Sequence, residues 1–201
     1  CAVPDGDLFR VLRQGRAQVV TAEIESFTAQ GVRLKSGEEL AADVIVSATG
    51  LQLQLFGGID VQVDGVPFEA PKSMGYRGIM LRDLPNLAVV MGYTNASWTL
   101  KADLSSEYFC RLINHLDAIG MRQVTPRDNG GNVRPEPFLD LQSGYIERAA
   151  HLLPAQGDRV PWKLHQNYLL DLALLRYGKL EDDYLEFSAP RQEPQAAWVQ
   201  P

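Results

Sequence analysis

The chain has 201 residues, of which 19 are basic and 25 acidic, and its formal net charge is −6. No block of like charges stands out, so on electrostatic grounds we expect neither nucleic acid nor an anionic membrane surface as a partner. No apolar run approaches the roughly 20 residues that a transmembrane helix needs, and no signal peptide is visible. We therefore expect a globular protein of the cytoplasm with no integral membrane segment.

The cysteines and histidines indicate no disulfide framework and no metal site. Cys1 and Cys110 form no Cys-x-x-Cys pair. Cys110 falls inside a helical pattern, so we expect a small buried hydrophobic residue there rather than a nucleophile. The three histidines match no metal-ligand spacing, which predicts that no metal is bound; they are His115, His151 and His165.

The first fifty residues predict a short helix, an antiparallel meander and one buried strand. Asp7 is a favourable N-cap for a helix that Gly15 closes. Short apolar stretches at 19–20, 24–28, 32–35 and 39–40 are separated by glycine-containing turns, as in a β-meander. Residues 43–48 contain an unbroken apolar run that ends at Thr49-Gly50, which predicts a strand buried on both faces.

The middle of the chain predicts a hairpin, a second buried strand and the longest helix. Asp64-Gly65 is a favoured turn pair between short strands near 61–63 and 66. Residues 87–91 predict a short buried strand, and a loop over 93–97 follows it. A helix is then expected from Trp98 to Ile119, where Gly120 stops it. Its apolar stripe recurs every four residues: Leu100, Leu104, Tyr108, Leu112 and Leu116.

The remaining residues predict a helical extension. A loop is expected over 127–137, a helix capped by Ser143 runs to about Leu153, and another helix covers 163–177. Glu181-Asp182-Asp183 indicates a solvated turn. We expect residues 189–201, which are rich in Pro, Gln and Ala, to be disordered.

Two polar stretches follow the predicted buried strands, and a doubly wound sheet binds ligands outside the carboxyl ends of its strands. The first is Thr49-Gly50, where the missing Cβ of Gly50 lets a cofactor approach the backbone closely. The alternative interpretation of Thr49-Gly50 is a simple turn at the end of a strand.

The second stretch contains Asn95, Ser97, Trp98, Thr99 and Lys101, at the start of the long helix. A helix N-terminus offers unpaired N–H donors and about half a positive charge, which suits an anion or the electron-rich edge of a reduced flavin ring. Trp98 can stack on such a planar ring. The alternative is that Asn95 or Ser97 only caps the helix and that Trp98 belongs to the core.

Taken together, these segments resemble the C-terminal part of the flavin-dependent monooxygenases, in the branch with the Baeyer–Villiger and flavin-containing monooxygenases. The resemblance is most specific in the pairing of Ala-Asp-Val-Ile-Val-Ser-Ala-Thr-Gly at 42–50 with Gly-Tyr-Thr-Asn-Ala-Ser-Trp-Thr-Leu-Lys at 92–101. Further matching stretches are Pro4-Asp5-Gly6-Asp7-Leu8-Phe9, residues 32–37, Pro161-Trp162 and Asn167-Tyr168.

The resemblance implies an α/β fold, namely a partial doubly wound, Rossmann-like dinucleotide-binding fold with a small antiparallel meander and a helical C-terminal extension. Residues 1–50 would close the NADPH-binding domain, 51–120 would form the C-terminal part of the FAD-binding domain, and 121–188 would cover part of the active site. The cofactor-binding residues would be those of the two polar stretches: Thr49, Gly50, Asn95, Ser97, Trp98, Thr99 and Lys101.

The implied reaction uses NADPH to reduce FAD, which then traps O2 as a peroxyflavin and inserts one oxygen atom into a ketone, sulfide or amine. The family's two Gly-x-Gly-x-x-Gly loops and its Phe-x-Gly-x-x-x-His-x-x-x-Trp fingerprint are absent, and Leu51 stands where many relatives place an aromatic residue. We therefore expect this chain to bind the cofactors weakly or not at all, and to be inactive by itself. No residue is assigned as a catalytic acid or base.

Two other interpretations stay open at this point. One is another two-dinucleotide flavoprotein, such as a pyridine nucleotide–disulfide reductase, which also uses an Ala-Thr-Gly strand. The other is a stand-alone, non-enzymatic ligand-binding or interaction domain. A part of a larger sheet should expose apolar edges, so the monooxygenase interpretation predicts that this chain self-associates.

Overall fold

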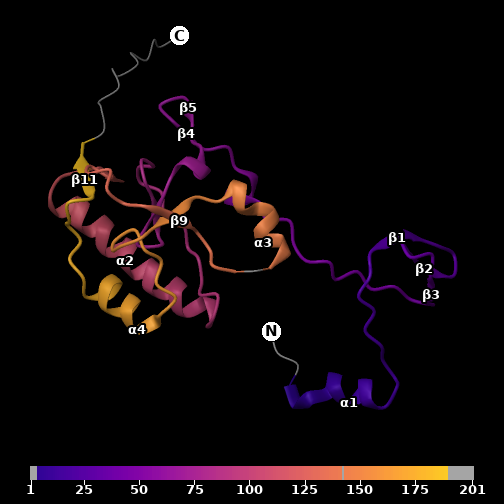
Figure 1. Ribbon diagram of the computed structural model, residues 1–201. Coiled ribbons are helices and arrows are strands. Elements are labelled where there is room, and N and C mark those ends of the chain that lie inside the picture. Colours follow the sequence, from indigo (N-terminus) through magenta and orange to yellow (C-terminus); the bar gives the residue numbers. More distant parts are fainter. Residues whose placement is uncertain (1–3, 142, 190–201) are drawn as a thin grey trace, which may run out of the picture. The chain divides into compact units, whose positions relative to one another are not determined.

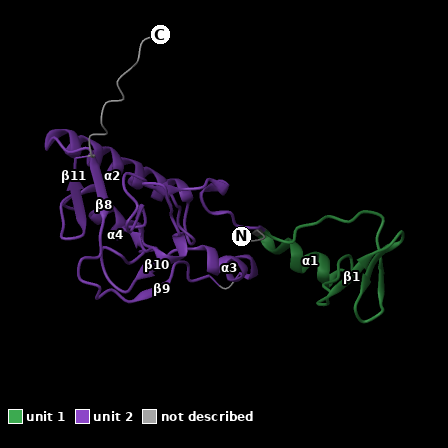
Figure 2. Cartoon of the chain, turned by 90° about the horizontal axis from the view of Figure 1, so that it is seen from above, with its two compact units in different colours: residues 1–50 green, residues 51–201 purple. Residues whose placement is uncertain are grey.

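A computed structural model describes residues 4–141 and 143–189. The chain divides into two compact units, residues 1–50 and residues 51–201, which Figure 2 colours green and purple. The expected disordered tail at 189–201 lies outside the described residues, apart from Ala189.

The first unit contains one helix and a three-stranded antiparallel sheet. Helix α1 (Asp7–Arg13) begins at Asp7 and has Gly6 as its N-cap, so the prediction that Asp7 is the cap was wrong by one position. Strands β1 (Ile24–Phe27), β2 (Gly31–Leu34) and β3 (Glu39–Ala41) lie in sequence order. The meander is therefore confirmed, although residues 19–20 form no strand.

A glycine is required where β2 starts. Gly31 has a φ of 154°, and a Cβ on it would overlap the carbonyl oxygen of Leu40 on the neighbouring strand β3. The close approach of the two strands at this end thus depends on Gly31, which stands in one of the glycine-containing turns expected from the sequence.

Residues 43–48 do not form the predicted buried strand. Val44 and Val46 are 79% and 83% exposed, and none of the described strands pairs with this segment. A strand that is buried on both faces needs hydrogen-bonding neighbours on each side, and β-propensity alone cannot supply them. All paired strands of the described residues are antiparallel, apart from one isolated parallel bridge between Met74 and Ala155. The mixed helices and small sheets agree with the α/β class.

The second unit begins with short hairpins. Strands β4 (Gln62–Val63) and β5 (Val66–Pro67) pair across Asp64-Gly65, as predicted, and both turn residues have positive φ. Strands β6 (Gly75–Tyr76) and β7 (Met80–Leu81) form a second hairpin. The strand predicted at 87–91 is absent, because this segment meets the rest of the fold through isolated bonds such as Val89 N–H to the Ile79 carbonyl, at 2.7 Å, rather than through a ladder.

Helix α2 (Trp98–Ala118) confirms the longest predicted helix and lies beside helix α4 (Tyr168–Asp171) in Figure 1. Leu104, Tyr108, Leu112 and Leu116 are buried, whereas Leu100 is 41% exposed. Cys110 is exposed, so the prediction that it is buried was wrong. No helix in the described part of the chain combines the length and apolar composition needed to cross a membrane.

The exposure of Cys110 follows from helix geometry. Residues two positions apart lie on different sides of a helix. Cys110 stands two positions from both Tyr108 and Leu112, which are fully buried, and it therefore faces away from the core.

The C-terminal extension is only partly helical. Strand β8 (Gln123–Pro126) pairs with β11 (Leu185–Ser188), and β9 (Pro135–Pro137) pairs with β10 (Ala155–Gly157), so the predicted loop at 127–137 ends in a strand. Ser143 stands before helix α3 (Gly144–Ala149), as expected, and a 3₁₀ turn continues that helix to Leu152.

The helix predicted over 163–177 begins late. Helix α4 (Tyr168–Asp171) starts after Asn167, whose Oδ1 accepts the Leu170 N–H at 3.1 Å, and a π-helical turn follows over Leu172–Arg176. An Asn side chain that bonds the third residue after it favours an N-cap over a helix interior. The apolar pattern alone did not reveal this cap.

The core of the second unit joins α2 to the hairpins and the extension. Its buried side chains come from residues distant in sequence: Met74, Tyr76, Ile79, Met80, Leu104, Tyr108, Leu112, Leu116, Val124, Val133, Trp162, Leu175 and Leu185. Trp162 has no exposed surface and meets Tyr76 and Tyr184 edge to face, at centroid distances of 5.6 and 5.7 Å. The extension thus contributes to the same core as α2.

Arg77 joins the hairpin β6–β7 to the end of the extension. Its Nη2 donates to Asp182 Oδ2 at 3.0 Å, and the Tyr76 hydroxyl donates to the same oxygen at 2.6 Å. Nη1 donates to the Leu174 carbonyl at 3.1 Å. Burial, as the main cause, raises the pKa of Tyr76. Asp182 is therefore an ion-pair partner, and the prediction of a merely solvated turn was wrong at this position.

Candidate functional site

The start of helix α2 forms an open polar surface. Asn95, Ser97, Trp98 and Thr99 are exposed there, and Trp98 keeps 61% of its surface accessible. Ser97 is the N-cap in an extended conformation, but its side chain makes no capping bond; its Oγ lies 2.8 Å from Thr99 Oγ1. The first N–H groups of this 21-residue helix have no intrahelical acceptor. This surface can therefore donate hydrogen bonds to an electron-rich group.

Gly92 holds the indole of Trp98 in place. A Cβ on Gly92 would overlap Trp98 Cγ, so the backbone at Gly92 passes directly against the indole. Trp98 is therefore neither a core residue nor a free side chain, because part of it is packed on Gly92 while most of its surface is exposed. The sequence marked Gly92 only as the end of a strand, and its contact with Trp98 was missed.

Lys101 lies under this surface, in a buried cluster with two residues that the sequence did not single out. Its Nζ donates to Asp171 Oδ2 at 2.7 Å, and the Tyr93 hydroxyl donates to the same oxygen, also at 2.7 Å. Lys101 and Asp171 are each 3% exposed and Tyr93 is 2% exposed. Desolvation by burial lowers the pKa of Lys101, and desolvation together with the bond to Asp171 raises the pKa of Tyr93.

The signal for Asp171 was present in the sequence. Asp171 is a single carboxylate between Leu170 and Leu172 in a helix with an apolar face. A carboxylate is rarely buried without a partner, and a lysine elsewhere in the chain was a candidate. Sequence reasoning could not identify Lys101 as that partner, because the pair is separated by 70 positions.

Gln166 connects the loop before α2 to the extension. Its Oε1 accepts the Thr94 N–H at 2.9 Å and the Thr94 hydroxyl at 3.1 Å. Its backbone carbonyl accepts Asn95 Nδ2 at 3.0 Å. The side-chain amide of Asn95 is thus used within the fold, and the extension determines where the loop lies.

The structure brings together the site residues predicted at the second polar stretch, with Lys101 buried beneath the others. Thr49 and Gly50 belong to the first unit, where both are exposed. Gly50 has a φ of 93°, a backbone conformation that favours glycine.

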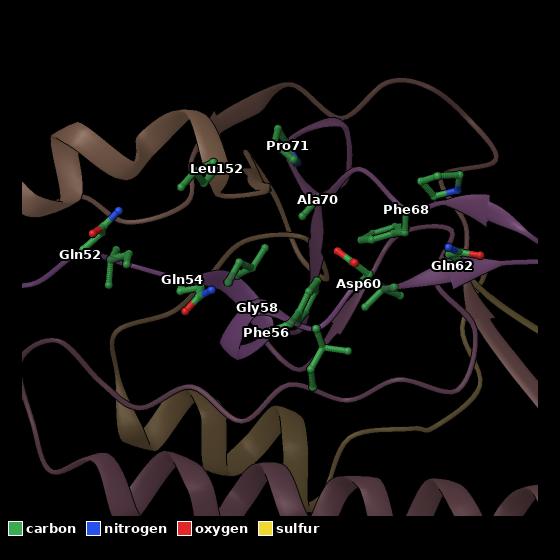
Figure 3. A pocket seen from close by; sticks show the side chains of 15 residues that line it. Gln52, Gln54, Phe56, Gly58, Asp60, Gln62, Phe68, Ala70, Pro71 and Leu152 are labelled. Atoms are coloured by element: carbon green, nitrogen blue, oxygen red, sulfur yellow. The ribbon is translucent and has the colours of Figure 1, made fainter.

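A hollow of about 870 Å³ lies in the second unit, as Figure 3 shows. Most of its lining is apolar and includes Leu55, Phe56, Phe68 and Leu152, while Asp60 is its only charged residue. Phe56 adopts a left-handed backbone (φ 53°), which is uncommon for an aromatic residue. The volume falls within the range of small-molecule sites. Nothing in the sequence indicated this hollow, although nearly all of its lining comes from residues 52–71, with Leu152 added from the extension.

The described side chains include no group of three or more His, Cys, Asp or Glu residues that could hold a metal ion.

Proteins named as flavoprotein monooxygenases match nearly the whole chain. FAD-containing monooxygenase EthA of Mycobacterium tuberculosis is 52% identical over 188 residues, which is 94% of this chain and 38% of that protein. EthA of Mycolicibacterium smegmatis is 48% identical over 191 residues, or 95% of this chain and 39% of the relative. "Probable FAD-binding monooxygenase AlmA" of Acinetobacter baylyi is 48% identical over 188 residues, or 93% and 38%.

The chain spans about two fifths of the length of these relatives. No family model and no solved structure matches it. Identity near one half over almost all of the chain nevertheless confirms the resemblance that the sequence motifs predicted. By its sequence, the chain matches part of proteins named as FAD-containing or FAD-binding monooxygenases.

Proposed function

We propose that the chain is part of an FAD- and NADPH-dependent monooxygenase, which inserts one oxygen atom from O2 into a ketone, by Baeyer–Villiger oxidation, or into a sulfide or an amine. The observation that carries the proposal is the exposed Trp98 beside the free N–H groups of α2. It stands in a chain whose relatives are named as FAD-containing. Those names favour this function over a disulfide reductase or a stand-alone binding domain.

In this proposal the start of α2 borders the flavin ring. The N–H groups of α2 and the side chains of Ser97 and Thr99 would donate toward the electron-rich edge of the ring, and Trp98 would form a wall beside it. Asn95 would hold the loop through its bond to Gln166. Bound FAD supplies the redox chemistry, while the protein binds and orients the reactants and excludes water.

We further propose that residues 1–50 close the NADPH-binding domain, that 51–120 belong to the FAD-binding domain, and that 121–188 cover part of the active site. The exposed run at 43–48 would then be a strand of a doubly wound sheet, with Thr49 and Gly50 at its ligand-binding end. The apolar lining of the hollow near Phe56 and Phe68 supports an organic substrate. We place the enzyme in the cytoplasm.

The isolated 201-residue chain is expected to self-associate, because Val44, Val46 and Leu51 expose 79%, 83% and 65% of their surfaces. Exposed apolar segments with free backbone groups pair readily with other copies. Light scattering should show species larger than the 22.3 kDa monomer, and Val46→Lys should reduce them. A monodisperse monomer at micromolar concentration would contradict this prediction.

The test of the flavin site uses the full-length flavoprotein to which we assign this chain. Trp98→Ala is expected to weaken FAD binding about three- to tenfold, since an aromatic contact contributes about 0.5–1.5 kcal/mol. Trp98→Phe should keep most of the affinity. Ile113→Ala, which alters another exposed residue of α2, serves as the control. Fluorescence titration of the apoprotein with FAD measures the affinities.

Unchanged FAD affinity in Trp98→Ala would show that this surface does not face the flavin. Oxygen uptake with NADPH and a panel of ketones, sulfides and amines tests the reaction itself. NADPH oxidation without an oxygenated product from any of these classes would overturn the proposed monooxygenase activity.

A further inference from the structure

We propose that Gln166 and Asp171, in the C-terminal extension, are positioning residues for the flavin site. They would hold the loop of residues 93–95 and the side chain of Lys101, and would thereby fix the surface at the start of α2. This inference rests on the proposed function, because it takes the start of α2 to be the surface that faces FAD. It reassigns Lys101 from a direct cofactor contact to an indirect role.

The first connection is made by Gln166 alone. Three hydrogen bonds from two consecutive loop residues reach it: Thr94 N–H at 2.9 Å, Thr94 Oγ1 at 3.1 Å and Asn95 Nδ2 at 3.0 Å. One of these donors is a backbone amide, so the bond fixes the path of the main chain and not only a side-chain rotamer. Ser97 and Trp98 follow directly along that path, and the position of Gln166 therefore sets where they begin.

The second connection lies inside the protein. Asp171 Oδ2 accepts from both Lys101 Nζ and the Tyr93 hydroxyl, each at 2.7 Å, and these three residues are at most 3% exposed. Lys101 Nζ also lies 5.6 Å from the centre of the Tyr93 ring. Because one carboxylate oxygen binds both Tyr93, at the start of the loop, and Lys101, in the first turn of α2, the loop and the helix start are fixed relative to each other.

The two connections belong to one rigid segment. Asn167 Oδ1 accepts the Leu170 N–H at 3.1 Å, and the Asn167 carbonyl accepts the Asp171 N–H at 3.0 Å. This single capped turn separates Gln166 from Asp171. A shift of the segment would therefore move Thr94 and Lys101 together, and the whole start of α2 with them.

The pairing of Lys101 limits what it can do at the site. Lys101 is 3% exposed and its ammonium is already hydrogen-bonded to a carboxylate, so it offers no free charge to a cofactor phosphate or ring. Lys101 thus affects the flavin site indirectly, because its bond to Asp171 fixes the position of the start of α2. Direct contact with the cofactor is left to the groups that remain exposed, namely the helix N–H groups, Ser97, Trp98 and Thr99.

The first arm of the test measures amide hydrogen exchange of residues 92–98 in the full 201-residue chain. Gln166→Ala is expected to speed exchange at Thr94 about tenfold, because the acceptor of its N–H is lost. Gln166→Glu keeps an acceptor oxygen at the same place and should restore slow exchange. Leu169→Ala, at a position that is 73% exposed in the same segment, is the matched control.

The second arm uses the FAD-loaded full-length flavoprotein. Gln166→Ala is expected to weaken FAD binding several-fold and to shift the absorption bands of the bound flavin, and Gln166→Glu should reverse both changes. A purely structural role of Gln166 would lower the melting temperature without a change in the flavin spectrum.

The outcomes separate this inference from the proposed function. Unchanged exchange at Thr94 in Gln166→Ala overturns the inference, whatever the flavin does. Faster exchange, with FAD affinity lowered by Trp98→Ala but not by Gln166→Ala, also overturns it and leaves the proposed function standing. If neither variant alters FAD binding, the flavin site lies elsewhere and both proposals fail.

Discussion

Asp171→Ala is expected to lower the free energy of unfolding of the 201-residue chain by about 3–5 kcal/mol, because it leaves the ammonium of Lys101 buried without its partner. The Tyr93 hydroxyl also loses its acceptor, and an unsatisfied buried hydroxyl costs about 1–3 kcal/mol. Urea unfolding at pH 7, followed by far-UV circular dichroism, measures the change. Asp103→Ala is the control, since that carboxylate is 80% exposed and lies 3.8 Å from Arg176.

If the unpaired ammonium of Lys101 causes this loss, removing the whole polar cluster should restore stability. Replacing a whole buried polar cluster with apolar residues of similar size is often neutral or stabilising, whereas removing one member is not. The triple variant Tyr93→Phe/Lys101→Met/Asp171→Leu should therefore be clearly more stable than Asp171→Ala. If Asp171→Ala lowers the free energy of unfolding no more than Asp103→Ala does, the burial of this ion pair is contradicted. If the triple variant is no more stable than Asp171→Ala, the unpaired charge is not the cause of the loss.

Features that depend on neighbours in sequence were predictable. The meander β1–β3 and the hairpin at Asp64-Gly65 follow from glycine-containing turns, and α2 follows from its apolar periodicity and from Gly120. In each case the hydrogen-bond partners lie within about a dozen residues along the chain. Tertiary contacts are not needed to specify such elements, although they stabilise them.

Features that depend on distant partners were not predictable. The runs at 43–48 and 87–91 have the composition of buried strands, yet neither is a strand among the described residues. The two sheets of the extension pair β8 with β11 and β9 with β10 across long separations. Apolar runs report burial, but they do not report which strand will provide the hydrogen-bonding partner.

In the candidate site, too, local features could be predicted from the sequence and long-range contacts could not. The polar start of α2 could be predicted, since Ser97 and Trp98 stand just before a periodic apolar stretch. The burial of Lys101 could have been found from helix geometry, because Lys101, Leu104 and Tyr108 share one face by their spacing of three and four positions. Counting Leu100 in the stripe instead placed the buried face about one position too early, and Leu100 is 41% exposed.

Trp162 marks where the extension enters the core, and the effect of removing it should be large. It has no exposed surface and meets Tyr76 and Tyr184 in edge-to-face geometry, with interplanar angles of 77° and 82°. Such pairs contribute about 0.5–1.5 kcal/mol beyond the area that they bury. Gly157 packs so closely on Trp162 that a Cβ there would overlap its side chain, so the backbone offers little room to close a cavity.

Trp162→Ala is therefore expected to lower the free energy of unfolding by about 3–5 kcal/mol, the usual range for deleting a buried aromatic side chain. Trp162→Phe should lose less, because one ring still fills part of the space between Tyr76 and Tyr184. Trp98→Ala is the matched control, since Trp98 is 61% exposed, and surface substitutions usually change stability by about 0.5 kcal/mol or less. Equal losses in Trp162→Ala and Trp98→Ala, measured by urea unfolding, would mean that the extension does not share a core with α2. A much larger loss of unfolding free energy in Trp162→Ala than in Trp98→Ala would show that the extension and α2, which carries the proposed flavin surface, fold around one core.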